Sequence, residues 1–270
     1  MTVYAFMCRG IGESVGSNML MGNGNVVGVR GYLDNRVVVT DVPWPASYGP
    51  TGGLGFGNSY GVNLQRGIID LNLAIGSVNE RVGGFKDTDR VALYGYSAGA
   101  TLVGNFANTG FWRSRISSVG LVADPMRPRG MGGLDSRLGW GVGGERRVSG
   151  LPVTWAADPR DPITVLEANS PVRTFADQSY AASFNPGQAP YWINDIAGKV
   201  SGAKWQQVAI NWWNPVGVFQ QYRRALDAVD RYLWRGDHTG YGVRQGQRNG
   251  GGTYLKQLAD DTSRAFKAWL

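Results

Sequence analysis

The chain has 270 residues, 43% of them hydrophobic, which is enough for one large domain or a domain with a sub-domain. A single cysteine, Cys8, and a single histidine, His238, exclude an internal disulfide and any metal cage built from several such residues, so we expect no metal and no cofactor. The net charge of +7 is scattered along the chain, which favours a solvated basic surface over a nucleic-acid interface. No run approaches the roughly 18 apolar residues of a membrane span, and no secretory signal is predicted.

Strand and helix patterns alternate through the first 157 residues. Short apolar or β-branched runs predict strands at residues 3–8, from 37 onwards, and at 90–94, 116–122 and 152–157. Apolar residues that recur every three or four positions from Leu64 to Val82 predict an amphipathic helix, which two glycines end. A helix rich in small residues is predicted at 98–108. This alternation predicts an α/β fold with a mainly parallel sheet.

The region from about 163 to 235 is different, because it is rich in aromatic residues. Apolar stripes predict two helices there, one around 205–212 and one around 219–233. The stripe of the second helix consists of Phe219, Tyr222, Leu226, Val229 and Leu233. We interpret residues 165–235 as a helical insertion, a linker or cap, in a single domain spanning 1–270. A final helix is expected from about 253 to 270.

A nucleophile is predicted at Ser97, within Gly95-Tyr96-Ser97-Ala98-Gly99. This segment matches the nucleophile elbow G-x-S-x-G, whose tight turn leaves no room for a side chain two positions before or after the serine. With 41 glycines in the chain the match can arise by chance, and Gly12-Glu13-Ser14-Val15-Gly16 is a second one. Ser97 is favoured because it lies between a predicted strand and a helix, with an earlier strand available to supply an oxyanion loop.

An acid and a base follow Ser97 in the chain order Ser, Asp, His that α/β-hydrolases use. Asp161, in the exit loop of the strand at 152–157, is the preferred acid. Asp158 in the same loop is its rival, and Asp124 after an earlier strand is a weaker alternative; each could instead stabilise a turn beside proline. His238 lies in a glycine-flanked loop and is the only imidazole that can serve as the base.

These residues predict hydrolysis of an ester. Ser97 attacks the carbonyl, His238 takes its proton and returns it to the leaving alcohol, and Asp161 orients the imidazole. Two backbone N–H groups, of Ile11 and Ala98, are expected to form the oxyanion hole.

Six segments share their order and spacing with one known family. They are Arg9-Gly10-Ile11-Gly12-Glu13, Val42-Pro43-Trp44-Pro45-Ala46-Ser47-Tyr48-Gly49-Pro50, the Ser97 elbow, Ala123-Asp124-Pro125 with Arg127 nearby, Asp161-Pro162-Ile163, and His238-Thr239-Gly240-Tyr241. Over about residues 3–245 the chain resembles the cutinase-like serine esterases, and among them the mycobacteriophage endolysin B (Lysin B) enzymes. The resemblance implies a three-layer α/β/α fold in which Ser97, Asp161 and His238 match the family's nucleophile, acid and base. It also implies that the helical insertion corresponds to the linker sub-domain of Lysin B.

The resemblance further implies a substrate and a site of action. Lysin B enzymes cleave the ester that joins mycolic acids to arabinogalactan in the mycobacterial cell wall during phage lysis, and they are lipolytic. Synthesis in the host cytoplasm, and release to the envelope through holes made by other lysis proteins, are implied as well. The chain departs from the family at Ile11, where threonine or serine is usual, and in lacking the disulfides of secreted cutinases. No N-terminal peptidoglycan-binding domain is expected.

Other functions stay open at this point. A generic cutinase or lipase, or an acyltransferase, would use the same three residues, and groove shape rather than sequence distinguishes them. An inactive hydrolase-fold binding protein is a further alternative, which the intact serine, aspartate and histidine oppose. Six tryptophans lie between the acid strand and His238 and are expected to divide between the core and a groove for a long acyl chain: Trp155, Trp192, Trp205, Trp212, Trp213 and Trp234. We expect a monomer.

Overall fold

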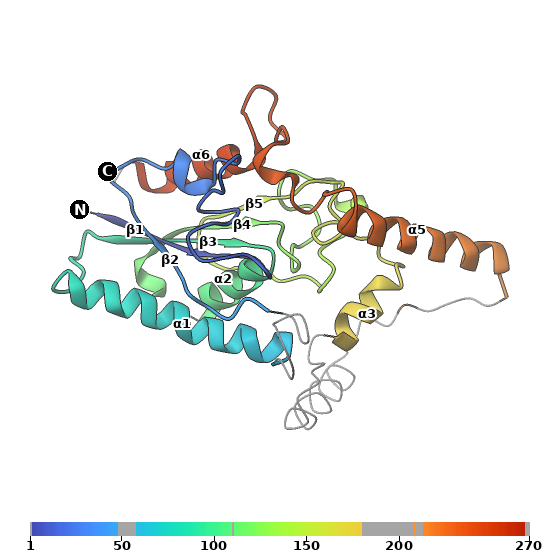
Figure 1. Cartoon of the computed structure of the whole chain (residues 1–270), viewed down its shortest axis with the longest axis horizontal. Coiled ribbons are helices and arrows are strands. Elements are labelled where there is room, and N and C mark those ends of the chain that lie inside the picture. The colour runs from blue at the N-terminus through green and yellow to red at the C-terminus, as the bar shows by residue number, and fades with distance from the viewer. Residues whose placement is uncertain (1, 48–57, 110, 180–207, 209–212, 268–270) are drawn as a thin grey trace.

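A computed structural model describes residues 2–47, 58–109, 111–179, 208 and 213–267 (Figure 1). Its centre is a parallel five-stranded sheet in the order β2-β1-β3-β4-β5. The strands are β1 (Val3–Cys8), β2 (Val38–Asp41), β3 (Arg90–Tyr96), β4 (Ile116–Val122) and β5 (Val153–Ala156). The predicted α/β class with a parallel sheet is confirmed, and each predicted strand is present within a few residues of its expected bounds.

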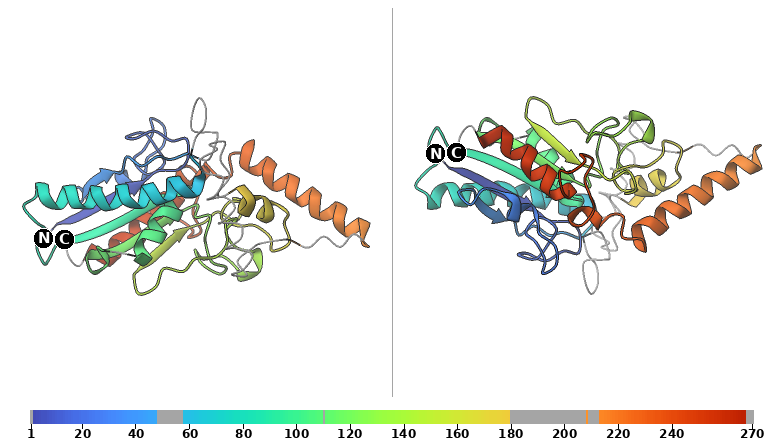
Figure 2. Two further views of the ribbon diagram at one scale, coloured as in Figure 1. Left: turned by 90° about the horizontal axis from the view of Figure 1, so that it is seen from below. Right: turned by 90° about the horizontal axis from the view of Figure 1, so that it is seen from above.

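Helices cover both faces of this sheet and make a three-layer structure. Helices α1 (Tyr60–Arg81) and α2 (Ala98–Thr109) lie on one face, and α6 (Tyr254–Lys267) lies on the other against β4 and β5 (Figure 2). Short 3-10 helices occur at Val29–Tyr32 (η1), Arg113–Arg115 (η3), Ser136–Leu138 (η4) and Gly240–Gly242 (η6). No helix in the described ranges is both long enough and apolar enough to cross a bilayer.

Two hydrophobic clusters fill the spaces between the layers, because successive side chains of a strand point to opposite faces. In β1, Tyr4, Phe6 and Cys8 belong to the cluster beneath α1 and α2. The alternate residues of β1 belong to the cluster beneath α6, together with Leu255 and Leu258. All six residues of β1 are buried, as is usual for an inner strand of a parallel sheet that helices cover on both sides.

The first long helix ends where its sequence predicts and begins four residues before the predicted apolar stripe. The Ser59 side chain caps the N-terminus of α1 by accepting a hydrogen bond from the N–H of Val62 at 3.3 Å. At the other end Gly83 and Gly84 adopt positive φ angles of 74° and 95°, which residues with a side chain rarely adopt, and the helix ends there. Of the predicted apolar stripe, four residues are buried: Leu64, Leu71, Ile75 and Val78.

The helical insertion is described only in part. Its described helices are α3 (Val172–Ser179) and α5 (Pro215–Leu233), and the predicted helix around 205–212 lies outside the described residues apart from Val208. Proline at the start of α5 and the Asn214 side chain, which accepts from the N–H of Gly217 at 2.9 Å, fix where that helix begins. Whether 165–235 folds as a unit of its own stays a prediction.

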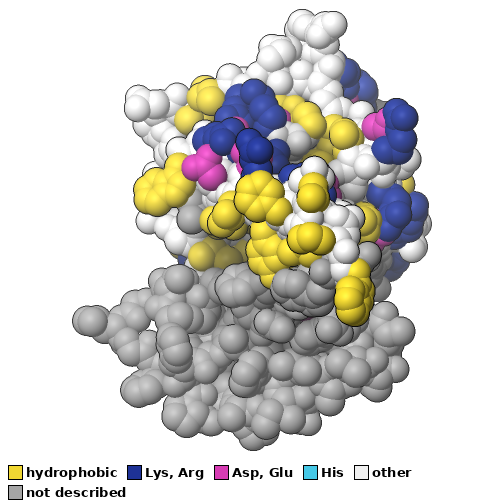
Figure 3. All heavy atoms as spheres, turned by 90° about the vertical axis from the view of Figure 1, so that its right-hand side faces the viewer, with side chains coloured by type: hydrophobic (Ala, Val, Ile, Leu, Met, Phe, Trp, Pro, Cys, Tyr) yellow, Lys and Arg dark blue, Asp and Glu magenta, His cyan; other side chains and the backbone are white. Residues whose placement is uncertain are grey.

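Four residues of the predicted apolar stripe of α5 are exposed: Phe219, Tyr222, Leu226 and Val229. Phe219 and Leu226 are 68% and 70% exposed, and the buried positions are instead Gln221, Ala225 and Ala228. Two of these three residues are alanines, and the Gln221 side chain donates to the carbonyl oxygen of Asn169 at 2.6 Å. Apolar side chains therefore gather at this end of the molecule beside lysine and arginine side chains (Figure 3).

Gly67 and Gly76, two glycines of α1, allow a matched test of how α1 packs on α2. A Cβ at Gly67 would lie 2.2 Å from Leu102 Cδ1 and 2.8 Å from the Trp44 ring, whereas a Cβ at Gly76 would meet nothing within 4 Å. We therefore expect Gly76→Ala to raise the free energy of unfolding by about 0.5–1 kcal/mol through helix propensity. Gly67→Ala should lower it by about 1–3 kcal/mol through overpacking. Urea unfolding of both variants measures the difference, and equal effects would contradict this packing of α1 on α2.

Candidate active site

Ser97 lies at the sharp turn between β3 and α2, at the carboxyl edge of the sheet. Its φ is +54°, a left-handed conformation that costs a residue with a side chain about 1–3 kcal/mol and that recurs at functional sites. A Cβ at Gly95 would lie 2.3 Å from the carbonyl oxygen of Gly99, and a Cβ at Gly99 would lie 1.9 Å from the carbonyl oxygen of Cys8. Both flanking glycines of the elbow are therefore sterically required.

His238 reaches Ser97 from a loop that follows α5. Its Nε2 is 2.8 Å from Ser97 Oγ. The imidazole stacks on the Tyr96 ring, with centroids 5.3 Å apart and planes 23° apart, and the Tyr96 hydroxyl donates to the carbonyl oxygen of His238 at 2.9 Å. A second ring, that of Tyr232 in α5, lies 5.3 Å from the imidazole. The backbone and the ring of His238 are thus both held, and the side chain is buried.

Asp161 lies on the other side of the imidazole. Its Oδ2 is 3.0 Å from His238 Nδ1 and accepts the Tyr241 hydroxyl at 2.7 Å, and its Oδ1 accepts the N–H of Ile163 at 2.9 Å. An ionised carboxylate can only accept, so Nδ1 carries the proton of the neutral imidazole. Nε2 is then an acceptor and is directed at the hydroxyl of Ser97, as a general base must be.

The rival acid, Asp158, is engaged elsewhere. Its carboxylate accepts from Arg160 at 2.9–3.0 Å and from Arg244 at 3.1 Å. Burial alone would raise the pKa of Asp158, but the hydrogen bonds and positive charges of the two arginines outweigh burial and lower it. Asp158 is therefore a structural anion that fixes the loop after β5.

The other two alternatives also lie outside the set around His238. Asp124 is fully buried, ion-paired with Arg146, and accepts from the indole N–H of Trp155 at 3.1 Å. Ser14, the serine of the second elbow-like match, is exposed and pairs with Ser17 across an isolated bridge. Neither residue has a hydrogen bond to His238 among the described residues.

The predicted oxyanion loop follows β1, next to the elbow that follows β3. The Glu13 carboxylate binds it by accepting the N–H groups of Gly10 at 2.7 Å and of Met19 at 2.8 Å. Burial raises the pKa of Glu13, and the two N–H donors only partly oppose this. Within the described ranges neither the N–H of Ile11 nor that of Ala98 has a hydrogen-bond partner, so both predicted donors are free to bind a ligand.

Two buried arginines hold the irregular stretches before and after β5, and the stretch after β5 carries Asp161. Arg127 donates to the carbonyl oxygens of Thr164 and Gly139, each at 2.8 Å. Arg173 donates to those of Gly141 at 2.8 Å and Glu167 at 2.9 Å. Burial lowers the pKa of Arg173 to about 9. Apart from η4, these two stretches are thus ordered without a helix or a strand of the sheet.

Some contacts at this site have no counterpart among the sequence predictions. Tyr96 and Tyr241 belong to quoted motifs, yet nothing in their spacing assigned them to His238 or Asp161. Tyr232 belongs to none of these motifs. An aromatic residue next to a predicted nucleophile, and another three positions after a predicted base, are the only signals that could have suggested these contacts.

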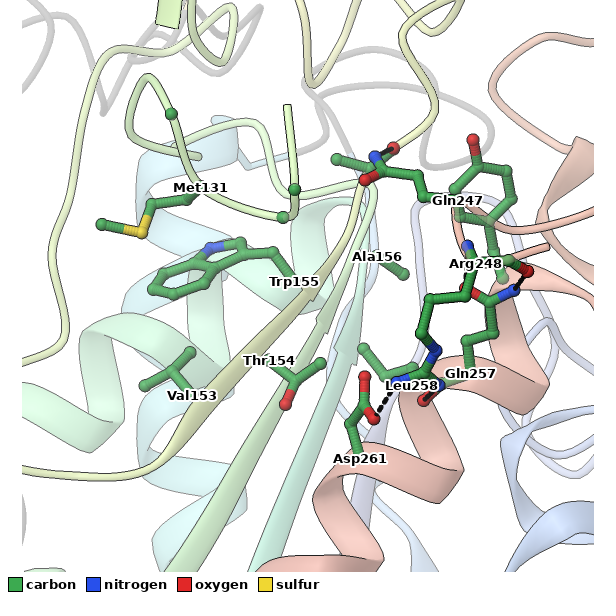
Figure 4. Close-up of a pocket in the computed structure, with 15 residues that line it drawn as sticks. Met131, Val153, Thr154, Trp155, Ala156, Gln247, Arg248, Gln257, Leu258 and Asp261 are labelled. Atoms are coloured by element: carbon green, nitrogen blue, oxygen red, sulfur yellow. Dashed lines mark hydrogen bonds and ion pairs between the residues drawn. The ribbon is translucent and has the colours of Figure 1, made fainter. Parts of the chain in front are cut away.

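A cavity of about 430 Å³ lies at the outer edge of β5, apart from the candidate triad. Its walls come from β5, the loop 130–133, residues 247–248 and α6 (Figure 4). Of the six tryptophans considered for an acyl groove, Trp155 lines this cavity, and Trp213 and Trp234 are 96% and 80% exposed. The other three lie outside the described residues. The acyl groove thus stays a prediction.

Comparison with known proteins places this fold. No protein-family model matches the chain, and no curated protein matches its sequence. Among solved structures, the crystal structure of lysin B from Mycobacteriophage D29 aligns with a TM-score of 0.57 and 14% identity over 98% of this chain and 99% of that one. The catalytic core of an acetyl xylan esterase from Trichoderma reesei (TM-score 0.41, 16% identity, 72% and 97% covered) and a cutinase-like protein from Cryptococcus sp. (0.38, 13%, 77% and 97%) also align. The chain therefore has the fold of lysin B, and the resemblance that its motifs indicated is confirmed for the fold.

Proposed function

We propose that this protein is a serine esterase with Ser97 as the nucleophile, His238 as the general base and acid, and Asp161 as the group that orients the imidazole. Ser97 Oγ attacks the ester carbonyl carbon while its proton passes to His238 Nε2. The N–H groups of Ile11 and Ala98 hold the oxyanion of the tetrahedral intermediate. His238 then protonates the leaving alcohol, and water hydrolyses the acyl-enzyme by the same steps.

One observation carries this proposal: His238 hydrogen-bonds to Ser97 on one side and to Asp161 on the other, at 2.8 and 3.0 Å. The positive φ of Ser97 and the two free N–H groups at the ends of β1 and β3 support it. A structural role alone gives no reason to hold a serine in a strained conformation beside a buried imidazole.

We further propose that the substrate is the ester between mycolic acids and arabinogalactan in the mycobacterial cell wall, with general lipolytic activity. The six motifs and the likeness of the fold to lysin B support this substrate class. Under this proposal the enzyme is a monomer made in the host cytoplasm, and it acts at the envelope after other lysis proteins release it. It needs no cofactor and no nucleic-acid partner.

The serine is tested first, with p-nitrophenyl esters from butyrate to palmitate and purified mycolyl-arabinogalactan as substrates. Ser97→Ala should lower kcat by about 10⁵–10⁶-fold on every ester that the wild type hydrolyses, because the nucleophile is lost. Ser14→Ala is the matched control and should keep wild-type turnover.

Three outcomes of this assay are informative. Fatty-acid release from the cell-wall material by the wild type, but not by Ser97→Ala, supports the full proposal. Activity on the synthetic esters alone would leave a generic cutinase or lipase. A folded wild type that is inactive on all substrates would contradict the esterase assignment.

The acid is tested by two isosteric variants in the same loop. Asp161→Asn should lower kcat by about 10⁴-fold, because the amide favours the wrong imidazole tautomer. Asp158→Asn should keep most of the turnover, because Asp158 bonds to arginines rather than to His238. Steady-state kinetics on the best p-nitrophenyl ester compares the two, and the reverse order would transfer the role to Asp158.

A further inference from the structure

The hydroxyl of Tyr241 lies between two parts of the loop that carries Asp161. It donates to Asp161 Oδ2 at 2.7 Å and accepts the backbone N–H of Asp158 at 3.2 Å. Tyr241 is 1% exposed, and its ring makes edge contacts with Tyr96 at 6.5 Å and with Tyr254 at 5.3 Å. The ring is therefore fixed, and the hydroxyl has one geometry.

The direction of these two hydrogen bonds follows from their chemistry. The N–H of Asp158 can only donate, so the phenol oxygen is the acceptor there and its proton points at Asp161. Burial and then the charge of Asp161 raise the pKa of Tyr241 well above its ordinary value, so the hydroxyl keeps its proton. Asp161 Oδ2 thus accepts two hydrogen bonds at once, one from Tyr241 and one from His238.

We propose that Tyr241 is a positioning residue of the triad, which holds Asp161 in place and shares the charge of the oxygen that binds His238. This inference rests on the proposed function. A carboxylate oxygen that already accepts a short hydrogen bond attracts a second proton less strongly. Removal of the Tyr241 hydroxyl should therefore strengthen the pull of Asp161 on a proton of the imidazole.

The other groups that face His238 and Asp161 stay in place when this hydroxyl is removed. They come from four elements: Glu13 from the loop after β1, Tyr96 from β3, Tyr232 from α5, and Asp158 with Arg160 and Arg244 around the loop after β5. Tyr241→Phe changes none of their charges. The variant loses two hydrogen bonds, and of these only the one to Asp161 involves the carboxylate oxygen that binds His238.

Nuclear magnetic resonance reads this effect directly, because His238 is the single histidine of the chain. In the Tyr241→Phe variant the pH midpoint of the His238 ring titration should move upward by about half a unit to one unit. Tyr254→Phe is the matched control: Tyr254 is the neighbouring buried tyrosine, its hydroxyl group has no hydrogen bond to the described residues, and its removal should leave the midpoint unchanged. An unchanged midpoint in folded Tyr241→Phe would overturn the proposal.

Ester hydrolysis gives the second readout. Tyr241→Phe should lower kcat about tenfold with little change in KM, and the acidic limb of its pH–rate profile should move upward together with the NMR midpoint. Equal loss of thermal stability in both tyrosine variants, with no shift of the limb, would make Tyr241 merely structural. If the wild type has no esterase activity the proposed function fails, whereas the NMR titration still tests the contact of Tyr241 with Asp161.

A measurement on the wild type covers the case in which Tyr241→Phe does not fold. The buried Tyr241 hydroxyl proton should give a slowly exchanging signal with cross-relaxation to the His238 Nδ1 proton, because both protons bind the same carboxylate oxygen. Absence of that cross-peak at low temperature would contradict the proposal.

Discussion

The candidate site depends on one close backbone contact, between Gly99 at the start of α2 and the carbonyl oxygen of Cys8 at the end of β1. No side chain fits between them, since a Cβ at Gly99 would lie 1.9 Å from that oxygen. The contact joins the elbow that carries Ser97 to the loop that carries Ile11. The proposed nucleophile and the proposed oxyanion donor therefore cannot move independently, which is the preorganisation that electrostatic catalysis requires.

The Tyr96 ring extends this arrangement to His238. A Cβ at Gly10 would lie 2.8 Å from Tyr96 Cδ1, so the loop after β1 lies directly on this ring. The imidazole stacks on the same ring, and the Tyr96 hydroxyl binds the carbonyl group of His238. The side chain of Tyr96, directly before Ser97, thus contacts both the loop after β1 and His238. Both are distant from it in sequence, and tertiary contacts rather than local structure bring them together.

The sequence predicted the sheet well because its strands are short runs of mainly apolar or β-branched residues, and it predicted the elbow because two glycines are sterically required there. It predicted α5 as a helix but not which side of it is buried. Periodicity gives the large apolar residues one face, whereas the buried residues of this helix are Gln221, Ala225 and Ala228. Asp158 and Asp161 leave the same strand three residues apart, so only the positions of Arg160, Arg244 and His238 distinguish them. The contact of Tyr241 with Asp161 joins residues 80 positions apart, and no local pattern encodes it.

The thiol of Cys8 follows from the same packing. It is fully buried at the end of β1, and burial, with a smaller effect of Asp41, raises its pKa far above its ordinary value. Thiols react as thiolates, so an alkylating reagent modifies Cys8 only in molecules whose β1 end has opened to water. Because the carbonyl group of Cys8 is the one that touches Gly99, such an opening also separates the elbow from the neighbouring loop. The alkylation rate of this single thiol therefore reports how often the elbow and the loop after β1 separate, and measuring it requires no substrate.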